Sequence, residues 1–217
     1  MDNYRFHQKF MQAVIALGGA ALLFTLYQWQ LAQPVTPILI LAMTAIATCS
    51  RYFVPIPGGL GQISLLDNFV LLALLLFGGD AAILFGALTS LCLSLRSGRP
   101  TLRVMFDGSV TAVSAFSVVW TLRLFMGIEV KPGSTILTLN FFKALLLVTL
   151  IQAAVSATIT LIGESYKIQK SAWRKRGALL LWTALAYPIG AIGACLGAWL
   201  VLSMGFSAFI AADVAIS

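Results

Sequence analysis

Two long apolar stretches lie back to back between Arg51 and Arg103, separated by a very short turn. The first ends at Phe77, Gly78-Gly79-Asp80 forms the turn, and the second ends at Leu95. An α-helix needs roughly 17–25 apolar residues to cross the hydrocarbon core of a bilayer. The two stretches therefore predict a transmembrane helical hairpin with basic residues at both open ends, which makes the chain a membrane protein.

The composition extends this prediction to the whole chain. Hydrophobic residues make up 60% of the sequence and charged residues 10%, whereas soluble domains contain about 25% charged residues. The apolar residues occur in long runs, unlike the short alternating segments of β-barrels. We expect an all-α, polytopic membrane helix bundle that forms a single integral membrane domain over residues 1–217. Seven spans are expected, at about 11–32, 35–50, 63–79, 80–97, 107–127, 139–163 and 177–204, and residues 206–217 resemble a partial eighth.

The basic residues predict the orientation, because lysine and arginine are retained on the cytoplasmic side. If the N-terminus is cytoplasmic, the inner segments contain most of the 14 lysines and arginines: Arg5, Lys9, Arg51, Arg96, Arg99, Arg103, Lys167, Lys170, Arg174, Lys175 and Arg176. Arg123, Lys131 and Lys143 then lie on the outer side. Topology and attraction to an anionic lipid bilayer account for the net charge of +7, so no nucleic-acid partner is expected.

Patterns of catalysis and metal binding are missing from the sequence. His7 is the single histidine, and there is no HExxH, GxSxG or P-loop motif. Cys49, Cys92 and Cys195 lie in separate apolar runs without a CxxC pair. These observations predict no enzymatic activity, no metal and no cofactor.

Ionisable residues within spans are costly and often mark a function. Near the cytoplasmic face, the sequence predicts a ring of ion pairs. In this ring Asp67 pairs with Arg51, and Asp107 pairs with Arg103 or Arg96. This interpretation is structural and assigns the ring no ligand.

Arg123 and Lys143 approach the outer interface from the fifth and sixth expected spans. Two interpretations remain open. Both side chains can extend to lipid headgroups, or they can point inward and bind a small anionic ligand that enters from outside. In the second case Asn140 and Gln152 would extend the pocket. Gln152 lies deep in its span, where an amide usually bonds to a neighbouring helix.

Two turns have a predictable local structure. The segment 55–61, with two prolines and three glycines, cannot be helical because proline lacks a backbone donor and glycine is too flexible. It forms either a re-entrant loop that lines a cavity or a plain surface loop. Asp80 is expected to cap the helix that follows it.

Small residues mark two possible helix-packing faces. Gly190, Gly193 and Gly197 follow one another in the seventh expected span and include a GxxxG pattern, which allows close approach of two helices. We expect tight packing within the bundle, with dimerisation as the alternative. Ala16 and Ala20 form a similar small face in the first span.

One part of the chain carries a family resemblance. Its elements are Pro55-Ile-Pro57-Gly58, Ser64-Leu65, Leu75-Leu76-Phe77-Gly78, Gly86-Ala87-Leu88, the arginines from Arg96 to Arg103, and Phe106-Asp107. This stretch resembles the membrane-associated sensor domains that precede HD-GYP phosphodiesterase, diguanylate cyclase and histidine kinase modules in bacteria, although those domains have Asn where this chain has Asp107. The resemblance implies a sensory input domain in the bacterial cytoplasmic membrane, with an unknown ligand and a cytoplasmic output module.

The same stretch is also similar to the substrate-binding S components of energy-coupling-factor vitamin transporters. Those proteins have a loop, an apolar hairpin around a Phe-Gly turn, and small residues after the turn, but they have six spans. This similarity implies a small-solute transporter component, with Ala16 and Ala20 as a docking face for its scaffold. An accessory subunit of a larger membrane complex, held by partner subunits, is a further alternative. We favour the sensory interpretation.

Overall fold

The computed structural model describes residues 2–29, 40–41, 44–45, 53–55, 62–64, 66–126, 139–164, 190–201 and 203. Helices dominate this part of the chain: α1 (Asp2–Trp29), α3 (Leu66–Phe77), α4 (Gly79–Arg96), α5 (Thr101–Met126) and α6 (Leu139–Glu164). A further apolar helix covers Gly190–Val201. Two short strands, β1 (Phe53–Pro55) and β2 (Gln62–Ser64), pair antiparallel with Val54 opposite Ile63. The helical bundle is therefore as expected, but the chain is not purely α.

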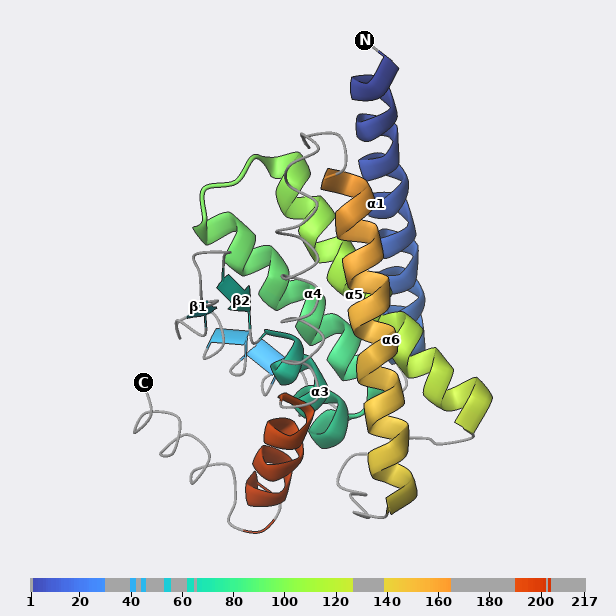
Figure 1. The fold of residues 1–217 in the computed structure, drawn as a ribbon, viewed down its shortest axis with the longest axis vertical. Coiled ribbons are helices and arrows are strands. Elements are labelled where there is room, and N and C mark those ends of the chain that lie inside the picture. The colour runs from blue at the N-terminus through green and yellow to red at the C-terminus, as the bar shows by residue number, and fades with distance from the viewer. Residues whose placement is uncertain are drawn as a thin grey trace.

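Helix α5 is central to the described bundle, because it packs against α4, α1 and α6. Helix α4 packs in turn on α3 and α1. Figure 1 shows α1 at the edge of the bundle, with its first turns extending beyond the other helices. The end of α4 and the start of α5 lie toward the same end of the molecule as the N-terminus, and the far end of α5 lies at the opposite end (Figure 1).

Glycine and proline define the two turns around α4. Gly78 has a φ of 89° between α3 and α4, and Gly98 has a φ of 65° between α4 and α5, a region that favours glycine. The carbonyl of Pro100 accepts hydrogen bonds from the backbone N–H groups of Arg103 and Val104 at 2.8 and 3.1 Å. These contacts start α5 within one turn of the end of α4.

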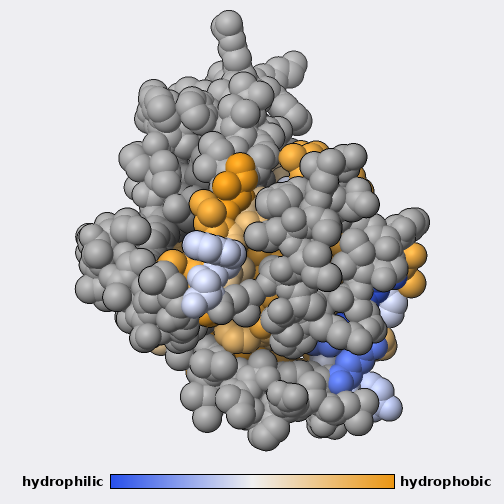
Figure 2. Space-filling model, turned by 90° about the horizontal axis from the view of Figure 1, so that it is seen from below, coloured by the Kyte–Doolittle hydropathy of each residue, from blue (hydrophilic) through white to orange (hydrophobic). Residues whose placement is uncertain are grey.

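The core lies where α3, α4 and α5 meet. Leu71, Ala73 and Phe85 are fully buried there, together with Ala115 and Val118. By contrast, only 28% of the apolar window of α1 is buried, against 61% for both α4 and α5. Seen from below, the strongly hydrophilic described residues gather on one side, and apolar described residues show elsewhere on the same face (Figure 2). The exposed apolar faces suit contact with lipid, and close packing holds the helices together there.

The described helices support the membrane class but not seven spans. Three are long and apolar enough to cross a bilayer: Phe6–Gln28, Gly79–Arg96 and Thr101–Leu124. Leu146–Ile159, which lies within the 26-residue α6, and Gly190–Val201 are shorter apolar helical segments. The expected spans 35–50 and 177–204 fall largely outside the described residues, and the run 206–217 lies entirely outside them.

The expected span at 63–79 is wrong. Helix α3 has 12 residues, which gives about 18 Å at 1.5 Å per residue, against a hydrocarbon core of about 30 Å. Residues 62–64 belong to β2 instead, and Gly78 ends the helix with its positive φ. The apolar run predicts one span because its composition does not distinguish a strand residue from a helical one.

Candidate functional site

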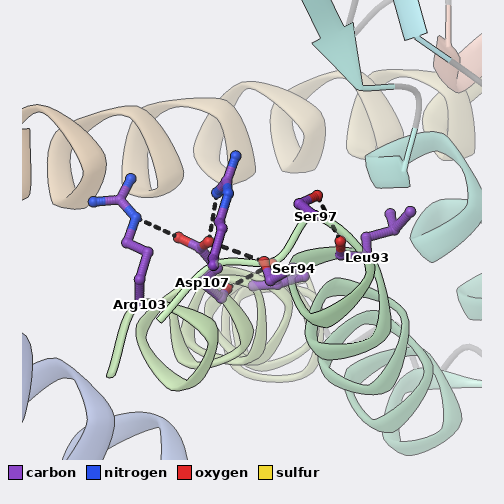
Figure 3. Close-up of polar contacts among 7 residues, drawn as sticks. Leu93, Ser94, Ser97, Arg103 and Asp107 are labelled. Carbon is purple, nitrogen blue, oxygen red and sulfur yellow. Dashed lines mark hydrogen bonds and ion pairs between the residues drawn. The ribbon is translucent and has the colours of Figure 1, made fainter. Parts of the chain in front are cut away.

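The first polar cluster surrounds Asp107 on α5, and we call it the Asp107 cluster. The carboxylate accepts hydrogen bonds from Nη1 of Arg99 at 2.6 Å and from Oγ of Ser94 at 2.9 Å, both at Oδ2. Nε of Arg103 lies 3.2 Å from Oδ1. Figure 3 shows Arg103 and Ser94 converging on Asp107 from α5 and α4. The sequence prediction named the pair of Asp107 with Arg103, and the structure adds Arg99 and Ser94.

Local backbone geometry explains why these side chains converge. Arg103 and Asp107 are four residues apart on α5 and so share a helix face. After α4, the hydroxyl of Ser97 donates to the carbonyl of Leu93 at 2.8 Å (Figure 3). The following glycine has a positive φ, and the N–H of Arg99 then donates back to the Ser94 carbonyl at 3.4 Å. The turn therefore returns Arg99 to the start of α5, over the carboxylate.

Two arginines contact the carboxylate of the Asp107 cluster. Arg99 lies in the turn after α4, and Arg103 lies in the first turns of α5. The guanidinium carbon of Arg103 lies 5.4 Å from the ring centroid of Phe106, a cation–π distance. The Arg99 side chain is 49% exposed, whereas the Asp107 side chain is 15% exposed. The cluster thus buries its carboxylate and presents an arginine outward.

The second polar cluster surrounds Arg123 near the end of α5, and we call it the Arg123 cluster. Nη2 of Arg123 donates to both carboxylate oxygens of Asp80 on α4, at 3.1 and 3.2 Å. Nη1 donates to Oε1 of Gln28 on α1 at 3.1 Å. The guanidinium carbon also lies 6.0 Å from the ring centroid of Trp120, and the Trp120 ring packs at a tilt against Phe24 of α1. One side chain therefore joins three helices.

The prediction that Asp80 caps its helix is wrong. Helix α4 begins at Gly79, its N-cap residue is Gly78, and no side chain caps it. Asp80 lies inside the first turn, where a negative charge is still favourable next to the free N–H groups of the helix. Its carboxylate is directed to Arg123 instead, because a charged donor forms a stronger hydrogen bond than a backbone N–H.

The structure alters the expected ligand pocket. Arg123 is paired with Asp80, so its charge is already balanced before any anion arrives. Gln152 is fully buried on α6, as its deep position in the span predicted. Asn140 and Lys143 lie near the start of α6, but their side chains are outside the described residues. Their contribution to a pocket stays a prediction.

The remaining inner-level pair also stays a prediction. Arg51 lies outside the described residues, and the structure describes the backbone of Asp67 in α3 but not its side chain. The segment 56–61, whose conformation the sequence left open, falls outside the described residues as well, whereas Pro55 ends β1 and is not helical, as expected.

The prediction that Gly193 packs within the bundle is wrong. Gly193 is exposed, and a Cβ atom added there would meet nothing within 4 Å. Gly190 is buried and Gly197 half-buried. The buried face of this helix instead consists of similarly small residues at helical spacing: Ala191, Ala194, Cys195 and Ala198. GxxxG spacing permits another helix to approach closely. In this helix, however, the neighbouring face that carries the alanines is the one that packs.

A different glycine makes the close contact on α1. Ala16 and Ala20 are exposed, while a Cβ atom added at Gly18 would lie 2.5 Å from Cβ of Ser109 on α5. The sequence pattern correctly indicates small residues in α1, but Ala16 and Ala20 lie on its exposed face, and the contact is made by Gly18.

Metal chemistry has no candidate in the described part of the chain, which contains no group of three or more His, Cys, Asp and Glu placed to hold an ion. Comparison with known proteins gives no match to a family model, a curated protein or a solved structure. The function therefore has to be argued from the two clusters themselves.

Sequence reasoning missed Gln28, Ser94 and Arg99 as members of these clusters. The sequence indicates Asp80 and Arg123 separately, the first as a helix cap and the second as a cation near the outer interface. One available signal is their depth along the expected spans. Both residues are expected at the outer end of their spans, where a carboxylate and a guanidinium can meet. The structure adds that α4 and α5 are neighbours, so the two residues do meet.

Proposed function

We propose that this chain is a membrane-embedded sensory input module of a bacterial signalling system, with a ligand site at the Arg123 cluster. The supporting observation is that α5 carries a polar cluster near each end. Asp107 and Arg123 are sixteen residues apart, which corresponds to about 24 Å along a helix. That length is close to the thickness of the hydrocarbon core, so one helix joins a polar site near each membrane face.

The proposed orientation places the N-terminus in the cytoplasm, as a multi-pass protein of the bacterial cytoplasmic membrane. Arg96, Arg99 and Arg103 gather at one end of the bundle. The ring centroid of Phe10 lies 6.4 Å from that of Phe106, so the start of α1, with exposed Lys9, lies at the same end. Lysine and arginine are retained on the cytoplasmic side, which makes this the inner end and the Arg123 cluster the outer one.

A ligand would act by exchanging partners at Arg123. The side chains of Arg123 and Asp80 are 28% and 26% exposed, so a small anionic group from outside can compete for the guanidinium. Binding would replace the contacts of Arg123 with Asp80 and Gln28, which attach α5 to α4 and α1. A ligand shifts a conformational equilibrium only through different affinities for the two states, and exchange of these contacts provides that difference.

Tryptophan fluorescence tests the proposal, because Trp120 lies beside Arg123. The purified full chain is titrated with acetate, citrate and inorganic phosphate at constant ionic strength. We expect at least one saturable change in emission that is lost in Trp120→Phe and in Arg123→Gln/Lys143→Gln, but kept in Lys9→Gln. The absence of saturation with all three anions, or an unchanged response in the double variant, would reject this ligand site.

A second candidate is the substrate-binding component of a small-solute transporter, or an accessory subunit of a membrane complex. The exposed position of Ala16 and Ala20 on the peripheral helix α1 favours it, since a small-residue face accepts a partner helix closely. Purification from native membrane in mild detergent, followed by intact-mass analysis, separates the candidates. A longer chain with a cytoplasmic module indicates a sensor, and co-purifying ATPase subunits indicate a transporter.

A further inference from the structure

The ion pair of the Arg123 cluster has a geometry that a ligand can replace. Both carboxylate oxygens of Asp80 bond to a single nitrogen of Arg123, Nη2, at 3.1 and 3.2 Å. The strongest arginine–carboxylate pairs instead use two nitrogens in parallel. Both side chains are also partly exposed, at 28% and 26%. The guanidinium and the carboxylate are therefore each accessible to a ligand, and their present contact is not the best that either can form.

Charge balance determines which ligand can separate this pair. Among the described residues, Arg123 is the cation that contacts Asp80. A simple anion on Arg123 would leave the mostly buried side chain of Asp80 without its cation, and an uncompensated charge in such a place costs free energy. A ligand that brings both a carboxylate and an ammonium replaces each partner with an equivalent one. The ion pair therefore favours a zwitterion over a simple anion.

Three aromatic rings lie beside the ion pair, and we call them the aromatic triad: Phe24 of α1 with Phe116 and Trp120 of α5. Their ring centroids are separated by 5.7, 5.9 and 6.1 Å, so each ring contacts the other two. Phe116, Trp120 and Arg123 follow at spacings of four and three residues, which places them on one helix face. Phe24 is 42% exposed. An accessible apolar surface is thus continuous with the guanidinium.

We infer that the Arg123 cluster binds a free zwitterionic amino acid with an apolar side chain. The ligand carboxylate accepts hydrogen bonds from the guanidinium of Arg123, its ammonium donates to Asp80, and its side chain packs on the aromatic triad. This inference rests on the ligand site proposed above and specifies the class of its ligand. Aromatic residues also gather at membrane interfaces without binding a ligand, and a comparison of amino acids with and without an apolar side chain separates that case.

Isothermal titration calorimetry of the full chain in mild detergent, corrected by titration of detergent alone, compares three ligands. Free phenylalanine should bind at least about tenfold tighter than 3-phenylpropanoate, which lacks only the ammonium and so loses a hydrogen bond between charged groups. It should bind at least about fivefold tighter than glycine, which lacks the ring that contacts the triad. Equal affinity in either comparison would overturn the inference while binding of 3-phenylpropanoate upholds the proposed site. If none of the three binds, both proposals fail.

Asp80→Asn should change the two affinities in opposite directions. Phenylalanine should bind about tenfold weaker, because its ammonium loses the carboxylate, whereas 3-phenylpropanoate should bind tighter, because Asp80 no longer competes for Arg123. A merely destabilised variant would weaken both ligands, and that result would overturn the inference. Asp2→Asn is the matched control, since it makes the same change of charge at the first residue of α1, outside the cluster. Both affinities should stay within about twofold of wild type there, and equal effects of the two substitutions would also refute a local site.

Discussion

The contact between Gly18 on α1 and Ser109 on α5 allows a quantitative test of helix packing in this bundle. A Cβ atom at position 18 would lie 2.5 Å from Cβ, 2.7 Å from Cα and 2.8 Å from Oγ of Ser109. Carbon atoms in contact normally lie about 3.5–4.0 Å apart. Alanine at this position therefore has to push the two helices about 1 Å apart, because one of the three clashing atoms belongs to the backbone.

The neighbouring Gly19 provides a matched control, since a Cβ atom there would meet nothing within 4 Å. Replacement of glycine by alanine in a helix gains about 0.5–1 kcal/mol in either position. Overpacking adds a cost of about 1–3 kcal/mol at position 18 only. Helix propensity cancels in the comparison, so Gly18→Ala should be less stable than Gly19→Ala by about 2 kcal/mol.

Thermal unfolding of both variants in the same mild detergent measures this difference, and we expect the melting temperatures to differ by about 4–8 °C for a chain of this length. Adding Ser109→Gly to Gly18→Ala should restore only part of the loss, because the clash with the Cα atom at 2.7 Å persists. If Gly18→Ala is as stable as Gly19→Ala, the close approach of α1 and α5 is wrong.

Three further predictions follow from the described contacts. Asp80→Asn and Arg123→Gln should be coupled by about 0.5–2 kcal/mol in a double-mutant cycle of unfolding free energies, because each residue alone leaves a partner unpaired; additive effects would refute the ion pair. Gly98→Ala should lower the unfolding free energy by about 1–2 kcal/mol, since its φ of 65° strains an L-residue although space is open around it; an unchanged value in chemical denaturation would contradict that conformation. N-ethylmaleimide should modify exposed Cys92 at least about tenfold faster than buried Cys195, as read by peptide mapping, and equal rates would argue against the burial of the helix Gly190–Val201.

The sequence predicts the hairpin turns more accurately than the helix ends. The span expected at 80–97 corresponds closely to α4, because glycines on both sides of it are unambiguous turn signals. Helix α5 was expected from residue 107 but begins at Thr101, and α1 begins at Asp2 rather than 11. Hydropathy identifies the part of a helix that lies in the membrane. Charged residues such as Arg103 lower the hydropathy at a helix end, so hydropathy alone does not show that the helix continues through them.

The site was less predictable because it depends on which helices are neighbours. Arg123 bonds to residues 43 and 95 positions away in the chain, and no local pattern encodes those distances. The pair of Arg103 with Asp107 was named from the sequence, since a spacing of four residues is itself a contact on a helix. Arg99 joins that pair only because the turn at Gly98 reverses the chain, a conformation that a residue count does not reveal.

The peripheral position of α1 has a consequence for biogenesis. The helix is synthesised before the helices it packs against: little of it is buried, and what it does bury faces α4, α5 and, to a lesser extent, α6. Oε1 of Gln28 accepts its hydrogen bond from Arg123 of α5, so this bond can form only after α5 has been synthesised. The arrival of α5 therefore brings α1 and α4 together through a helix that packs on both, and α6 is added to α5 afterwards.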